Sequence, residues 1–96
     1  MRLSQDMQQA ILERVHEYVP EASVYVFGSR ANDTKKGGDI DILVLDDRVL
    51  TLQEKNKIIT RLWMQFGEQK IDIASFTRDS DDPFKRLVME HAVEIV

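Results

Sequence analysis

The chain has 96 residues, 43% of them hydrophobic and 31% charged, which is the composition of an ordinary globular protein, and we expect residues 1–96 to form a single domain. Thirteen Lys and Arg against 17 Asp and Glu give a net charge of −4, which disfavours direct nucleic-acid binding because that function needs a basic surface. The absence of cysteine excludes disulfides and thiolate metal sites and favours a cytoplasmic location, and no apolar run reaches the ~18 residues of a membrane span.

The first third of the chain predicts a helix followed by a short strand. Ser4 is a suitable N-cap for a helix with apolar residues at helical spacing, and Pro20 ends that helix. The β-branched and aromatic run at 24–27 predicts a strand that stops at the Gly-Ser pair which follows it. The polar residues 30–38 predict a loop or one short helical turn.

The middle of the chain predicts a second strand and a second helix. Residues 39–45 form the strand, and Thr51 with Glu54 forms a capping box at the start of the helix, which ends at Gly67. One apolar stripe of this helix is expected in the core: Leu52, Ile59, Leu62, Trp63 and Phe66.

The last third predicts a strand at 70–76, a helix capped by Ser80, and a short edge strand at 93–96. The order of elements predicts an α+β fold in which a small mixed β-sheet is flanked by helices. The last helix is expected to carry one apolar face: Phe84, Leu87, Val88 and His91.

Two aspartates at the head of the second predicted strand stand out, because strand interiors are usually depleted in aspartate. Alternation places Asp39 and Asp41 on one face, about 6.6 Å apart along the strand. Asp72 adds a third carboxylate to another apolar strand. If the two strands are neighbours, the three carboxylates converge as hard oxygen ligands suited to a pair of Mg²⁺ ions, which would clamp the attacking and leaving oxygens of a phosphoryl displacement.

The Gly-Ser pair before these aspartates suits phosphate binding. Gly28 lets the backbone approach a ligand closely, and a helical turn starting at Ser29 would offer free N–H groups and a hydroxyl. Simpler alternatives remain open at this point. The aspartates could be solvated at the rim of a hairpin, Asp72 could be a structural edge residue, and Arg30 could pair with a surface carboxylate instead of a triphosphate.

The segments GSRA at 28–31 and DID at 39–41 resemble the signature of the DNA polymerase β-type nucleotidyltransferase superfamily. Nearly the whole chain resembles the stand-alone minimal nucleotidyltransferases, or MNT proteins, which implies a polymerase β-like fold and ATP as substrate. Two Mg²⁺ ions and the nucleotide phosphates would then be held by the matching residues: Asp39, Asp41 and Asp72 for metal and catalysis, Gly28, Ser29 and Arg30 for the nucleotide.

The resemblance also implies a partner. MNT proteins resemble antitoxins paired with HEPN toxins, so the expected reaction moves AMP from ATP onto a hydroxyl of a HEPN-like partner protein. The alternatives are a non-catalytic antitoxin that acts by contact, and an aminoglycoside-type small-molecule nucleotidyltransferase, which would need a second domain. The chain departs from the family pattern at Asp33 and Gly38, where many relatives have glycine and serine, and we expect altered loop detail there and a retained site.

Overall fold

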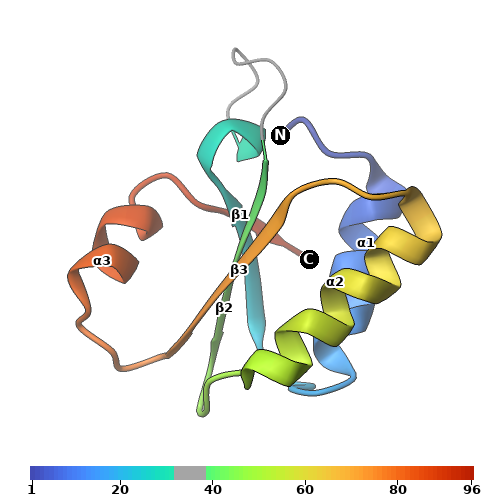
Figure 1. The fold of residues 1–96 in the computed structure, drawn as a ribbon. Helices are drawn as coiled ribbons and strands as arrows, with labels where there is room; N and C mark the ends of the chain where they lie inside the picture. The colour runs from blue at the N-terminus through green and yellow to red at the C-terminus, as the bar shows by residue number, and fades with distance from the viewer. Residues whose placement is uncertain (32–38) are drawn as a thin grey trace.

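A computed structural model describes residues 1–31 and 39–96 and contains a four-stranded sheet with helices on both faces (Figure 1). The expected α+β architecture is confirmed, and the departures at Asp33 and Gly38 lie outside the described residues. The elements in chain order are α1 (Gln5–His16), β1 (Ser23–Phe27), the 3₁₀ turn η1 (Gly28–Ala31), β2 (Ile40–Asp46), α2 (Leu52–Phe66), β3 (Ile71–Thr77), α3 (Pro83–Met89) and β4 (Val93–Ile95).

The sheet is mixed, with the strand order β3-β2-β1-β4. β1 is antiparallel to both β2 and β4, whereas β2 and β3 are parallel and joined through α2. The condition for the three aspartates to converge, that the second and third strands are neighbours, is therefore met. Because these two strands run in the same direction, both begin at the same end of the sheet.

The main core lies between one face of the sheet and the helices α1 and α2, which lie side by side on that face (Figure 1). The apolar residues of β2 that alternate with Asp39 and Asp41 are buried there. The central contributors are Ile11 and Val15 of α1, Val24 and Val26 of β1, Ile40, Ile42 and Val44 of β2, and Ile58 and Leu62 of α2.

Three of the predicted helix boundaries are confirmed by their capping contacts. The hydroxyl of Ser4 accepts a hydrogen bond from the Met7 N–H at 3.1 Å, and Thr51 and Glu54 form both halves of a capping box. Gly67 ends α2 with a φ of 91°. No helix in residues 1–31 and 39–96 is both long and apolar enough to cross a membrane.

The predicted apolar stripe of α2 is wrong in part. Ile58, which the stripe omitted, is fully buried, whereas Leu52 is 72% exposed and Trp63 is 36% exposed. Only a narrow line of α2 is buried, because α1 covers the rest of that sheet face. The Trp63 indole N–H instead donates to the Gln69 carbonyl at 2.6 Å and braces the turn into β3, while Phe66 is half-buried against the core.

The start of α3 also corrects the sequence reading. Asp82, and not Ser80, is the N-cap, because its carboxylate accepts from the Phe84 N–H at 2.8 Å. Pro83 occupies the first helical position, where its missing N–H costs nothing. The predicted apolar face of this helix is wrong in part: Val88 is half-buried, but Leu87 is 64% exposed and His91, beyond the helix, is also exposed.

α3 lies on the opposite face of the sheet from α1 and α2 (Figure 1). The Phe84 ring packs against Phe27 and Phe76, with centroids 6.0 and 6.2 Å away. Lys85 is buried beneath the helix, and its ammonium donates to three backbone carbonyls at the end of β3 and just beyond it, those of Thr77, Arg78 and Ser80. The Phe84 contacts hold α3 over the sheet between Phe27 and Phe76, and the Lys85 hydrogen bonds tie it to the end of β3 and the residues that follow.

Candidate active site

The three aspartates lie together at the end of the sheet where β2 and β3 begin. Asp41 and Asp72 are directly paired in the parallel register, so their side chains leave the same face side by side. Asp39 stands one residue before β2 and is on that face by alternation. Asp41 is half-buried and Asp72 is exposed, which leaves the group open to a ligand.

The Gly-Ser turn is in direct contact with this group. Phe27 is paired with Asp41 across the antiparallel β1–β2 register, so η1 begins beside the Asp41 carboxylate. Gly28 has a φ of 72°, and a Cβ placed on it would lie 2.5 Å from Asp41 Oδ2. Only glycine fits at this position, because any side chain would be strained and would displace the carboxylate. Ser29 and Arg30 follow in the same turn and are half-buried.

The Asp41 carboxylate carries uncompensated negative charge. Burial raises its pKa above the ordinary value of 3.8, and the negative charges of Asp72 and Asp39 raise that pKa further. The positive charge of Lys70 acts in the opposite direction and lowers the pKa of Asp41. Crowded carboxylates of this kind are often found where a cation is bound.

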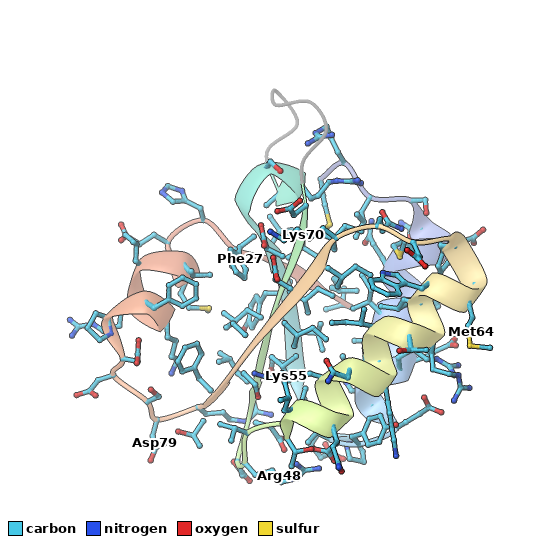
Figure 2. All side chains as sticks on the ribbon, viewed as in Figure 1. Phe27, Arg48, Lys55, Met64, Lys70 and Asp79 are labelled. Carbon is cyan, nitrogen blue, oxygen red and sulfur yellow. The ribbon has the colours of Figure 1, made fainter. Side chains whose placement is uncertain are left out.

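Lys70 is a site residue that the sequence reading missed. Its Nζ lies 3.5 Å from Asp39 Oδ2, and its carbonyl accepts from the Ile40 N–H at 3.0 Å. The figure with side chains places Lys70 at the same end of the sheet as Phe27 (Figure 2). The signal was present in the sequence, since alternation along Lys70-Ile71-Asp72 places the lysine on the face of the aspartate.

The amino-terminal segment is hydrogen-bonded to the same turn. The Arg2 N–H donates to the Arg30 carbonyl at 2.8 Å, and the Arg2 guanidinium donates to the Ser29 carbonyl at 3.0 Å. Arg30 returns a hydrogen bond at 3.2 Å from its Nη1 to the Arg2 carbonyl. The amino-terminal segment therefore holds the turn in place. The two segments are far apart in the chain, so no local sequence pattern predicts this contact. A role of Arg30 in nucleotide binding stays a prediction.

The chemistry of the donor set suits Mg²⁺, which takes one or two protein carboxylates together with phosphate oxygens. Asp41 and Asp72 supply two adjacent carboxylates, and the raised pKa of Asp41 marks a charge that a cation would relieve. In the described ranges, however, no group of three carboxylate, histidine or cysteine side chains is arranged to hold a metal ion. The third carboxylate, Asp39, is instead paired with Lys70.

The sequence matches a family model described as a nucleotidyltransferase domain over residues 9–95. No curated protein sequence shows significant similarity to the chain. The expectation of the family from the GSRA and DID segments is thus confirmed by a match that spans both of them and the Asp72 strand.

Solved structures of toxin–antitoxin complexes have the same fold. A toxin–antitoxin with AMP-PNP is 20% identical with a TM-score of 0.73, and the match covers 93% of this chain and 72% of that one. A complex of a tri-AMPylated Shewanella oneidensis HEPN toxin with its MNT antitoxin is 19% identical with a TM-score of 0.71, covering 98% and 72%. The MntA–HepT toxin–antitoxin is 18% identical with a TM-score of 0.69, covering 97% and 72%. The chain therefore has the fold of the MNT antitoxins.

Proposed function

The chain belongs to the nucleotidyltransferase domain family, and on that premise we propose that it transfers AMP from ATP to a hydroxyl group of a partner protein in a Mg²⁺-dependent reaction. The observation that carries the proposal is the direct pairing of Asp41 with Asp72, beside a glycine turn whose backbone contacts the Asp41 carboxylate. A solvated hairpin rim would need neither the neighbouring third aspartate nor the close fit at Gly28.

The site residues divide the tasks of the proposed reaction among them. Asp39, Asp41 and Asp72 would hold Mg²⁺, which when bound neutralises charge on the transferred phosphoryl group. The backbone of Gly28 and Ser29 positions the β- and γ-phosphates, and the hydrogen bonds from Arg2 keep that turn in place. Arg30, whose Nη1 is bonded to the Arg2 carbonyl, contributes to nucleotide binding through this turn.

The bond changes are those of a simple displacement. The acceptor hydroxyl oxygen forms a bond to the α-phosphorus of ATP, and the bond from that phosphorus to the oxygen bridging to the β-phosphate breaks. Pyrophosphate leaves, and Asp72, an exposed member of the carboxylate group, accepts the hydroxyl proton. Positioning and charge neutralisation supply most of the rate in such transfers.

A protein acceptor, specifically a HEPN-like toxin, is favoured by two observations. One structure with the same fold contains an AMPylated HEPN toxin, which is the product such a reaction would give. On this chain, α3 and the residues that follow it expose apolar side chains of the kind that protein interfaces bury: Phe84, Leu87, Met89 and Val93. The net charge of −4 disfavours nucleic acid as the acceptor.

Mass spectrometry of a HEPN-type partner tests the proposal after incubation with this protein, ATP and Mg²⁺. We expect AMP groups on tyrosine, serine or threonine side chains of the partner. The double change Asp39→Ala with Asp41→Ala should abolish the added mass and leave association intact, because a standard interface buries about 800 Å² per partner and the site is a small part of that. Asp46→Asn, at the opposite end of β2, is the matched control and should transfer AMP normally.

Two results would contradict the proposal. If the partner gains no mass with the unaltered protein while being neutralised in cells, contact alone accounts for the function. If the double variant neutralises the partner as well as the unaltered protein does, the carboxylates play no part in that neutralisation.

A further inference from the structure

The strongest feature that the proposed reaction leaves unused is the ammonium of Lys70. It lies 3.5 Å from Asp39 Oδ2, and its charge also reaches Asp41. Its backbone is fixed beside the site, because the Ile40 N–H donates to the Lys70 carbonyl at 3.0 Å where β2 and β3 begin to pair. The sheet therefore anchors the Lys70 backbone next to the carboxylate group.

The side chain itself is free to leave. Lys70 is 69% exposed and Asp39 is 45% exposed, so water screens their ion pair and no packing holds the ammonium in place. A stronger cation can therefore displace it at small cost. Such a cation and the ammonium compete for Asp39, because a dication and a monocation about 4 Å apart repel each other even in water.

We propose that Lys70 is an internal counter-ion that competes with a divalent metal for Asp39, so that the site takes up the metal with a nucleoside triphosphate in preference to the metal alone. The inference rests on the proposed function. A free metal ion has to displace the ammonium from Asp39 and offers it no new anionic partner. A metal that arrives with a triphosphate brings negative phosphate oxygens to which the displaced ammonium can turn.

The arrangement of the carboxylates agrees with this role. No group of three metal-ligating side chains stands ready in residues 1–31 and 39–96, and Asp39 is the carboxylate paired with Lys70. Because the Lys70 side chain is 69% exposed, it can leave Asp39 without disturbing the packing of the sheet.

Calorimetric titration tests the inference with Mn²⁺ alone and with Mn²⁺ plus a non-hydrolysable ATP analogue. Lys70→Gln should tighten the binding of Mn²⁺ alone by about three- to tenfold, the effect of removing one exposed charge next to a dication. The same variant should not tighten the binding of the metal–nucleotide pair. Lys70→Arg keeps the charge and should bind Mn²⁺ as the unaltered protein does.

Lys57→Gln is the matched control, because Lys57 is exposed on α2 and belongs to the groove formed with Tyr18. It should leave both affinities unchanged. Equal Mn²⁺ affinity in the unaltered protein and in Lys70→Gln would overturn the inference, as would equal tightening by Lys70→Arg. Both results leave the proposed function standing if the metal–nucleotide pair still binds. Failure of the unaltered protein to bind that pair would overturn the proposed function, and the inference with it.

Discussion

The two ends of the sheet each carry a cluster of acidic side chains, and the clusters differ in their counter-ions. Figure 2 places Lys70 and Phe27 at one end of the molecule and Arg48 and Asp79 at the other. At the far end the Arg78 guanidinium lies 3.6 Å from Asp46 and donates to the Ser23 hydroxyl and the Glu21 carbonyl. At the near end three aspartates face a single exposed lysine among the described residues.

The acidic residues at the far end are paired within the fold and stabilise it, whereas those at the near end remain open to a ligand. At the far end Arg48 makes two hydrogen bonds of 2.9 Å to Glu54, and these lower the pKa of Glu54 to about 2. At the near end burial and like charges raise the pKa of Asp41. Acidic residues whose charge is satisfied within the fold stabilise it, whereas acidic residues left in mutual repulsion are open to a ligand. Removing an acid should therefore have opposite effects at the two ends.

The largest effect should come from Gly28→Ala. The positive φ of 72° and the 2.5 Å approach to Asp41 Oδ2 both oppose a side chain, so we expect a loss of about 1–3 kcal/mol in the free energy of unfolding. AMP transfer should fall below detection, because the Asp41 carboxylate must move. Thermal unfolding and a transfer assay measure the two losses.

Gly67→Ala is the matched control for that change. Gly67 also has a positive φ, 91°, but a Cβ there meets nothing within 4 Å. It should lose a similar amount of stability and keep full transfer activity. Equal activity in the two variants would show that contact with Asp41 is not what Gly28 provides.

Glu54→Gln should destabilise the far end by about 1 kcal/mol, a value reduced from the pKa shift because water screens the exposed partner Arg48. The pKa of Glu54 is lower in the folded chain than its ordinary 4.5, so its stabilisation is complete above pH 4.5 and is lost as pH falls through about 2. Urea unfolding of both proteins across this range measures the difference. A difference that persists below pH 2 would point to packing and not to charge.

Asp41→Asn should have the smallest effect and the opposite sign. Because the folded-state pKa of Asp41 is raised, ionisation costs stability as pH rises through the ordinary value of 3.8 and the raised value above it. Without metal, the variant should be more stable at neutral pH by about 0.5 kcal/mol, or 2–4 °C in Tm. The gain should vanish below pH 3.8, and a variant that is less stable at neutral pH would contradict the charge-repulsion account.

The sequence predicted the parts of this molecule that depend on local pattern. The caps at Ser4 and Thr51 follow from hydrogen-bonding chemistry within one turn, and the shared face of Asp39 and Asp41 follows from strand alternation. The pairing of Asp72 with Asp41 was expected only on the condition that the strands were neighbours, which tertiary structure decides.

The features that the sequence did not predict depend on contacts between distant segments. Lys85 is buried because three carbonyls at and just beyond the end of β3 converge on it, and composition gives no sign of that. Trp63 was placed in the core by helical spacing, but the area that α2 can cover is set by the position of α1. The hydrogen bonds from Arg2 to the turn likewise join segments that are 27 residues apart in the chain.

Because Asp41 and Asp72 lie on two strands that pair in parallel, the candidate site is complete only after those strands have paired. The β1–β2 pair carries Gly28 and Asp41 and forms between segments close in sequence. Asp72 joins the group only when β3, which follows α2 in the chain, pairs with β2. Non-local parallel pairing of this kind is slow, because the intervening loop must close first. A nascent chain with the hairpin formed and β3 undocked therefore holds the glycine turn without the full set of carboxylates. The full set of carboxylates is therefore present only after this non-local pairing has formed.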